Sequence, residues 1–170
     1  MESETGLSGA AIIAAIKQAG VTHVAALPDI TTSAGLLWPL SNDPDLELVR
    51  LCKEDEGVSI CAGLYFCRRR AVLMIQQTGF FDSINAIRAI AVEYGQPICM
   101  IIGLLGKAAG EAPAESRYSV RIVEPILDAM GIDHLCMETT ADVARLPGAI
   151  DRAYKTSRPL AALVGQRLDP

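Results

Sequence analysis

The sequence predicts an α/β fold, a three-layer sandwich in which a mostly parallel six-stranded sheet has helices on both faces. Short runs of Val, Ile, Leu and Met are apolar at consecutive rather than alternate positions, which is typical of strands buried on both sides. Segments with helical spacing of apolar residues separate these runs, as in a parallel sheet with crossover helices. The alternation continues over all 170 residues without a shift in composition, so we expect a single domain.

The expected helices have recognisable starts and stops. Residues 8–19 form the first helix, with Ser8 as its N-cap and Gly20 at its end. Further helices are expected at residues 54–69, 82–94, 120–130 and 141–156. Candidate N-caps of the later helices are Asp82, Ser83, Thr139 and Thr140.

The expected strands are short and apolar, and turn residues separate them from the helices. They lie at residues 23–27, 46–51, 71–75, 97–102, 134–137 and 159–164. Residues 30–45 hold turn residues and one short helical piece, and residues 77–81 are expected as a loop. Residues 103–119 are rich in glycine, alanine and charge, which indicates a long loop.

Composition excludes several classes of protein. With 51% hydrophobic and 21% charged residues the chain is not disordered, because disorder requires low hydrophobicity and high charge. The net charge of −5 disfavours nucleic-acid binding, which needs a basic face. The apolar content is high for a small chain, so we expect part of its apolar surface to face a partner chain.

The location expected from the sequence is the cytoplasm. No apolar run approaches the roughly 18 residues of a membrane span, and the acidic start at residues 1–4 lacks the basic region of a signal peptide. The five cysteines are an odd number and form no CxxC pair. We therefore expect buried reduced thiols rather than a disulfide framework or a metal site in this chain.

Three loops are candidate sites, because ligands of parallel sheets bind at the carboxyl ends of the strands. They are residues 28–33, the Lys53–Glu54 junction and residues 76–83. The acidic run that opens with Glu54 has two interpretations: favourable charges at a helix N-terminus, or a carboxylate beside an apolar helix wall, poised for proton exchange. Residues 76–83 are either an ordinary strand-to-helix turn or an anion site at a helix N-terminus, and they lack the GxGxxG and GxxxxGK[ST] patterns.

A longer pattern combines two of these loops. Glu54 precedes Gly63 by nine positions on one helix, Tyr65 follows, and Ile75-Gln76-Gln77-Thr78-Gly79 and Ser83-Ile84-Asn85-Ala86 come after the next strand. In order and spacing this resembles the pyrimidine-binding domain of thiamine-diphosphate-dependent 2-oxo acid decarboxylases, most closely the enzymes that act on sulfopyruvate and phosphonopyruvate. The resemblance extends over nearly the whole chain and implies the same α/β fold.

The resemblance implies a catalytic role for Glu54. In this family a glutamate hydrogen-bonds N1′ of the cofactor aminopyrimidine, so that the 4′-amino group can act as a base toward the thiazolium C2 proton. Glu56 is the alternative, because the Glu56-Gly57 pair allows a shifted register. An aspartate would be too short to reach the ring, and a glutamine cannot exchange the proton.

Other residues carry over by position in the pattern. The cofactor-binding candidates besides Glu54 are Gln76, Gln77, Thr78 and Gly79. Substrate candidates at the first loop, on the long loop and just beyond it are Pro28, Asp29, Thr31, Lys107, Arg117 and Arg121. The cations among them suit a sulfonate, phosphonate or carboxylate group, although such residues are also commonly only solvated. Phe80 and Phe81 depart from the family, which has small residues there.

The resemblance also implies a partner. In the family a GDG…N motif on a second domain holds the cofactor diphosphate through a divalent metal, and no GDG occurs here. We therefore expect Mg²⁺ and the diphosphate to be held by a separate beta subunit in a hetero-oligomer, with thiamine diphosphate bound between the chains. Alternatives are one half of a split acetolactate-synthase-like carboligase, or a non-catalytic homologue kept for assembly or ligand binding.

Overall fold

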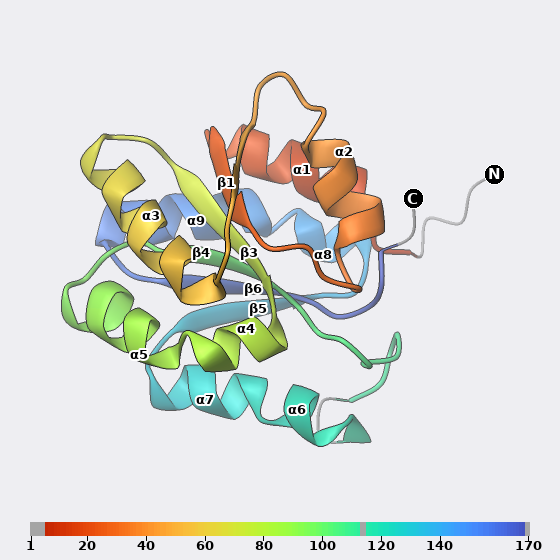
Figure 1. The fold of residues 1–170 in the computed structure, drawn as a ribbon. Coiled ribbons are helices and arrows are strands. Elements are labelled where there is room, and N and C mark those ends of the chain that lie inside the picture. Colours follow the sequence, from red (N-terminus) through yellow and green to blue (C-terminus); the bar gives the residue numbers. More distant parts are fainter. Residues whose placement is uncertain (1–5, 113–114, 169–170) are drawn as a thin grey trace.

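The chain folds around one six-stranded sheet, in which every neighbouring pair of strands is parallel (Figure 1). The computed structural model describes residues 6–112 and 115–168, so the acidic start at residues 1–4 lies outside the described residues. The strand order is β2-β1-β3-β4-β6-β5. The strands are β1 (His23–Ala26), β2 (Glu47–Arg50), β3 (Ala71–Gln76), β4 (Cys99–Gly103), β5 (Asp133–Met137) and β6 (Leu160–Val164). The predicted fold class is confirmed.

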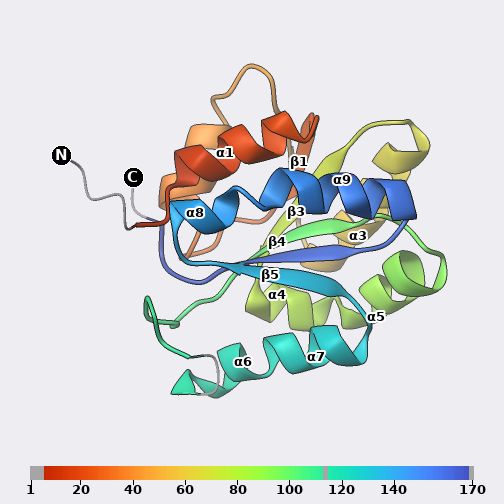
Figure 2. The same cartoon turned by 180° about the vertical axis from the view of Figure 1, so that it is seen from behind.

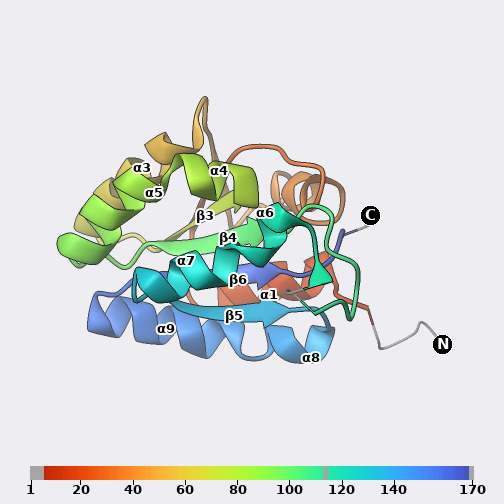
Figure 3. The ribbon, with the colours of Figure 1, turned by 90° about the horizontal axis from the view of Figure 1, so that it is seen from below.

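Helices cover both faces of this sheet (Figures 2 and 3). The first layer comprises α1 (Gly9–Gln18), η1 (Ser33–Leu37), α2 (Trp38–Leu40), α8 (Thr140–Val143) and α9 (Leu146–Thr156). The second comprises α3 (Glu54–Phe66), α4 (Gln77–Asp82), α5 (Ile84–Ala86), η2 (Ile87–Glu93), α6 (Tyr118–Arg121) and α7 (Val123–Ala129). No helix in the described parts of the chain is both long and apolar enough to cross a membrane.

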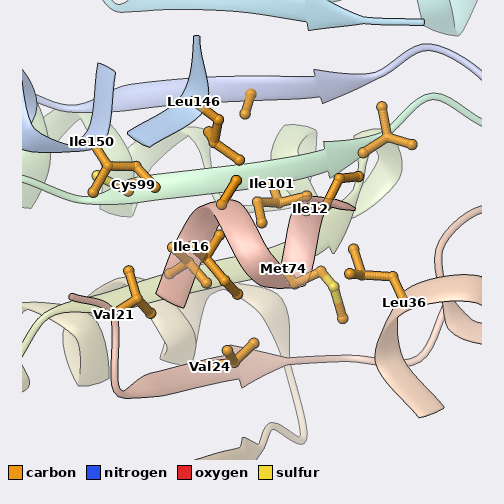
Figure 4. Packing of buried hydrophobic residues seen from close by; sticks show 14 of the residues in the cluster. Ile12, Ile16, Val21, Val24, Leu36, Met74, Cys99, Ile101, Leu146 and Ile150 are labelled. Atoms are coloured by element: carbon orange, nitrogen blue, oxygen red, sulfur yellow. The ribbon is translucent and has the colours of Figure 1, made fainter. Parts of the chain in front are cut away.

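Each face of the sheet supports its own hydrophobic core, which is why the strands are apolar at consecutive positions. Along β3, Val72 and Met74 belong to the core under α1 and α9, whereas Leu73 and Ile75 belong to the core under α3 and α7. Figure 4 shows the first core, where Ile12 and other α1 side chains meet residues of β1, β3 and β4. The inner strands β1, β3, β4 and β6 are thus buried between two apolar layers, whereas the edge strands β2 and β5 are partly exposed.

A close backbone approach explains one glycine in the first layer. A Cβ atom at Gly9 would lie 1.7 Å from the carbonyl oxygen of Gly35, so α1 can pack onto η1 only without a side chain at this position. Ser8 caps α1 as predicted, because its hydroxyl accepts a hydrogen bond from the backbone N–H of Ala11 at 3.3 Å. The start of the first layer therefore follows the sequence closely.

The prediction of a loop at residues 77–81 was wrong, because α4 begins at Gln77. Phe80 is fully buried in the second core, and its packing favours a helical turn at a place where Gly79 had suggested a loop. The predicted cap at residues 82–83 was also wrong. The Ser83 hydroxyl is buried without a hydrogen-bond partner among the described residues, and Asp82 forms an ion pair with Lys53 instead.

Several predicted helices are shorter or divided. The helix that starts at Glu54 ends at Phe66 because Arg68 has a positive φ of 58°. The last predicted helix is split into α8 and α9, and Pro147 stands in the first turn of α9, where proline is tolerated. Thr139 caps α8 in a reciprocal capping box with Asp142.

The cysteine prediction was correct only in part. All five thiols are free, and Cys61 and Cys99 are buried, with Cys136 half-buried. Cys52 and Cys67 are exposed, because they lie just before and just after α3 rather than on its packed face. Within the described residues, no group of three or more histidine, cysteine, aspartate or glutamate side chains could hold a metal ion.

Candidate active site

Glu54 stands where the carboxyl end of β2 passes into α3. It is the first residue of the helix and is half-buried. Its side chain lies directly against the backbone of Gly79 on α4: a Cβ atom at Gly79 would be 2.3 Å from Cγ of Glu54 and 2.6 Å from both Cδ and Oε1. Since β1 separates β2 from β3 in the sheet, it is the packing of α3 on α4 that brings these two residues together.

Glu56 has a different environment from Glu54. Its Oε2 atom accepts hydrogen bonds from the backbone N–H groups of Cys52 at 3.1 Å and Lys53 at 3.3 Å. The side chain therefore completes a capping box at the start of α3 and is exposed to solvent. Of the two glutamates that the sequence left open, Glu56 caps the helix and Glu54 faces α4.

Lys53 ties the start of α3 to the end of α4. Its ammonium group forms ion pairs with Asp82 at 3.0 Å and Asp55 at 3.1 Å. The hydrogen bonds that Lys53 donates to Asp82, and next to Asp55, raise the pKa of Lys53 above its ordinary value. Such exposed pairs contribute little to stability, and of the two only the Lys53–Asp82 pair links α3 to α4.

The predicted cofactor residues on the third loop have separate roles in the fold. The buried Gln77 side chain donates to the Leu105 carbonyl oxygen at 3.1 Å and accepts from the Leu105 N–H at 2.8 Å, so both the nitrogen and the oxygen of its amide are engaged within the chain. Gln76 accepts a hydrogen bond from the Thr78 hydroxyl at 3.1 Å, and Thr78 is exposed. Gly79 is buried beneath Glu54. The structure thus brings Glu54 and Gly79 into contact and attaches the long loop to the same helix through Gln77.

The first loop forms a tight turn at the end of β1. Asp29 Oδ1 accepts from the backbone N–H groups of Thr31 at 2.6 Å and Thr32 at 2.9 Å, and the carboxylate also binds the Thr32 hydroxyl. The turn packs over the end of β4, because a Cβ atom at Gly103 would lie 3.0 Å from Cβ of Thr31. Thr31 is buried, and its hydroxyl has no partner among the described residues, whereas Pro28 is exposed. The Asp29 carboxylate is therefore occupied in shaping the turn.

The three predicted cations of the long loop lie in unlike surroundings. The side chain of Lys107 is only 1% exposed, pairs with Glu138 and donates to the carbonyl oxygen of Ala108 at 3.2 Å. Arg117 and Arg121 are both exposed. Nothing along the sequence points to Glu138, because it lies 31 residues from Lys107 and the two loops meet only through the strand order β4-β6-β5.

Comparison with solved structures defines the class of domain. The fold matches the thiamine-diphosphate-dependent 4-hydroxybenzoylformate decarboxylase of Rhodococcus jostii RHA1 with a TM-score of 0.63 and 19% identity, over 99% of this chain and 34% of that one. It matches the 2-oxoglutarate:ferredoxin oxidoreductase of Magnetococcus marinus with a TM-score of 0.70 and 12% identity, over 100% of this chain and 32% of that one. The fold is that of the pyrimidine-binding domains of thiamine-diphosphate enzymes.

Sequence relatives narrow this class, although no protein-family model matches. The chain is 33% identical to sulfopyruvate decarboxylase subunit alpha of Methanococcus maripaludis over 155 residues, which is 91% of this chain and 92% of that subunit. The corresponding subunit of Methanocaldococcus jannaschii is 27% identical over 90% of both chains. The chain belongs to the sulfopyruvate decarboxylase alpha-subunit family. It spans 40% of the sulfopyruvate decarboxylase of Methanosarcina acetivorans, to which it is 28% identical.

Proposed function

We propose that the chain is the pyrimidine-binding subunit of a thiamine-diphosphate-dependent decarboxylase of a small anionic 2-oxo acid, sulfopyruvate or the similar phosphonopyruvate. The names of its relatives support the reaction and the division into subunits. The observation that carries the proposal is the placement of Glu54. Its carboxylate lies at the carboxyl edge of the sheet, half-buried and free of any helix-capping role.

The surroundings of Glu54 fit an aminopyrimidine. Gly79 presents only backbone to the Glu54 side chain, and a single added methyl group would fill the space that the carboxylate now occupies. The exposed Thr78 and half-buried Gln76 lie at the same helix start and offer polar groups beside it. Gln77, by contrast, supports the site indirectly by holding Leu105.

When bound, thiamine diphosphate would supply the electron sink for loss of CO₂. The task of this chain is to hold and exchange one proton at N1′ of the pyrimidine, and Glu54 is the residue that performs it. Its partial burial limits competition by water for that hydrogen bond. A glutamine at this position would keep the shape but could not exchange the proton.

The remaining parts of the site would come from a beta subunit that carries the GDG…N motif and holds the diphosphate through Mg²⁺. An apolar groove of about 410 Å³ between α3 and η2 supports such a partner. Phe66 and Tyr94 line it and are 74% and 78% exposed, which is unusual for large apolar side chains without a partner. The groove runs along the second half of α3, the helix that begins with Glu54.

The test compares Glu54→Gln with Glu56→Gln in the complex of this chain with its beta subunit. CO₂ release from sulfopyruvate should fall about 100- to 10,000-fold in Glu54→Gln, the usual range for loss of a general acid–base group. It should change little in Glu56→Gln, because the glutamine oxygen can still accept the capping hydrogen bonds. Loss of activity in Glu56→Gln alone would transfer the role to Glu56, and activity in both variants would refute the proposal.

Three further measurements address the alternatives. Formation of acetolactate from pyruvate would identify a carboligase half instead of a decarboxylase. Full turnover by the purified chain without a partner would contradict the proposed division of the site. A complex that assembles and binds neither thiamine diphosphate nor a 2-oxo acid would identify a non-catalytic homologue.

A further inference from the structure

The guanidinium group of Arg117 is free to bind an anion. Arg117 is exposed at the N-terminal boundary of α6, and among the residues that the structure describes it forms no ion pair with a carboxylate. Lys107, on the same loop, is buried and neutralised by Glu138. Arg121 is one helical turn further on and stacks over the ring of Tyr118, 5.5 Å from its centre. Of these three cations, Arg117 is the one that has neither a carboxylate nor an aromatic ring as partner among the described residues.

Arg117 rests on a backbone segment that is held to the Glu54 site. Its side chain covers Gly106: a Cβ atom there would lie 2.5 Å from Cδ and 2.9 Å from Nη1 of Arg117. Gly106 has a φ of +87°. The backbone N–H and carbonyl groups of Leu105, the residue before it, are both hydrogen-bonded to the Gln77 side chain. The guanidinium group is therefore supported by a fixed turn rather than by a mobile loop.

The same contacts lead back to Glu54. Gln77 opens α4, and two residues later Gly79 lies against the Glu54 side chain. Helix α4 also contacts α6, which Arg117 precedes, and Figure 3 shows α6 beside α4 at this edge of the sheet. Arg117 and Glu54 thus flank α4 at the carboxyl ends of the strands, one offering a fixed positive charge and the other a carboxylate.

We propose that Arg117 is the specificity-determining residue that binds the second anionic group of the substrate, the one on C3 of the 2-oxo acid. This inference rests on the proposed decarboxylase function and names the residue that distinguishes a dianionic substrate from pyruvate. A sulfonate or phosphonate offers two oxygens to the parallel N–H groups of one guanidinium, a match that lysine or an amide cannot reproduce. The turn at Gly106 places no charged group against the guanidinium, and the Arg117 side chain is exposed to solvent.

The experiment uses the complex of the chain with its beta subunit and compares wild type, Arg117→Gln, Arg117→Lys and a control, Arg69→Gln. Arg69 is an exposed arginine just before β3, at the opposite edge of the sheet, so its loss changes the net charge equally. The first readout is the KM for sulfopyruvate. The second is the Kd of 3-sulfopropionate, which carries the sulfonate but no reacting carbonyl. The third is the Kd of thiamine diphosphate, measured by calorimetry.

In Arg117→Gln we expect the KM for sulfopyruvate and the Kd of 3-sulfopropionate to rise about 10- to 100-fold, the effect of losing a charge-assisted hydrogen bond. Arg117→Lys should give an intermediate value, and the Kd of thiamine diphosphate should stay unchanged in all variants. Unchanged 3-sulfopropionate binding in Arg117→Gln, equal weakening in Arg69→Gln, or failure of the wild type to bind 3-sulfopropionate would each overturn the inference. A wild-type complex that binds 3-sulfopropionate through Arg117 but does not decarboxylate sulfopyruvate would refute the proposed function alone.

Discussion

Gly79→Ala tests whether the site depends on the absence of a side chain beneath Glu54. The new Cβ atom would lie 2.3 Å from Cγ of Glu54, more than 1 Å inside the ~3.5 Å of an ordinary carbon–carbon contact. The Glu54 side chain is flexible and half-exposed, so it can rotate away without moving the backbone. We expect the carboxylate to be displaced by about 1 Å while the fold is kept, and a displacement of that size costs roughly 100-fold in rate.

The stability of the variant should move in the opposite direction. Gly79 lies inside α4, where alanine is favoured over glycine by up to ~1 kcal/mol. The free energy of unfolding should therefore be unchanged or slightly higher, whereas decarboxylation falls. A drop in activity without a drop in stability is the pattern expected of a positioning defect.

The assay combines urea unfolding of the chain with CO₂ release by the complex. Gly148→Ala is the matched control, because Gly148 is also helical, in α9 on the other face of the sheet, and a methyl group there meets no atom within 4 Å. Combining Gly79→Ala with Glu54→Gln gives the decisive comparison. If Gly79 acts through Glu54, the double variant should be no slower than Glu54→Gln alone. Full activity of Gly79→Ala, or additive losses in the double variant, would refute the reasoning.

Three further predictions concern stability and reactivity. Glu56→Ala should destabilise the chain by about 1 kcal/mol in urea unfolding, since two backbone N–H groups at the start of α3 lose their acceptor; an unchanged midpoint would contradict the capping role. Glu138→Gln should cost about 3 kcal/mol because it leaves the ammonium of Lys107 buried without a counter-charge, and adding Lys107→Met should recover most of the loss. Iodoacetamide should label the exposed thiols of Cys52 and Cys67 first at pH 8. Burial raises the pKa of Cys136 to about 11 and that of Cys61 to about 12, which keeps both thiols protonated. Equal labelling rates for all five cysteines would contradict this.

The fold could be predicted because its signals are local. Consecutive apolar residues in each strand identify a sheet covered on both faces, and Ser8 and Thr139 mark helix starts by their own side-chain chemistry. The predictions failed where packing overruled a local signal. Phe80 enters the second core and makes residues 77–82 helical despite Gly79, and Ser83 is buried rather than capping.

The candidate site was predictable in outline and not in detail. The spacing from Glu54 to Gly63 and the run that ends in Gly79 indicated which strand ends to examine. The spacing to Gly63 favoured Glu54, but Glu56 stayed open as the alternative because both stand in the first turn of one helix. Their environments differ because Glu56 accepts a hydrogen bond from the backbone before the helix, whereas Glu54 packs against Gly79, which lies on α4 after the next strand.

By itself, the sequence determined the sheet, its two helical layers and the family to which the chain belongs, since hydrophobic patterning and motif spacing are read along the chain. Only the tertiary structure decided which polar side chains remain available to bind a ligand. Gln77 is used by Leu105 and Lys107 by Glu138, partners 28 and 31 residues away that the parallel strand order brings together. The physical reason is that a charge or an amide loses its capacity to bind a ligand once a neighbour in space has satisfied it, and neighbours in space are set by the order of the strands.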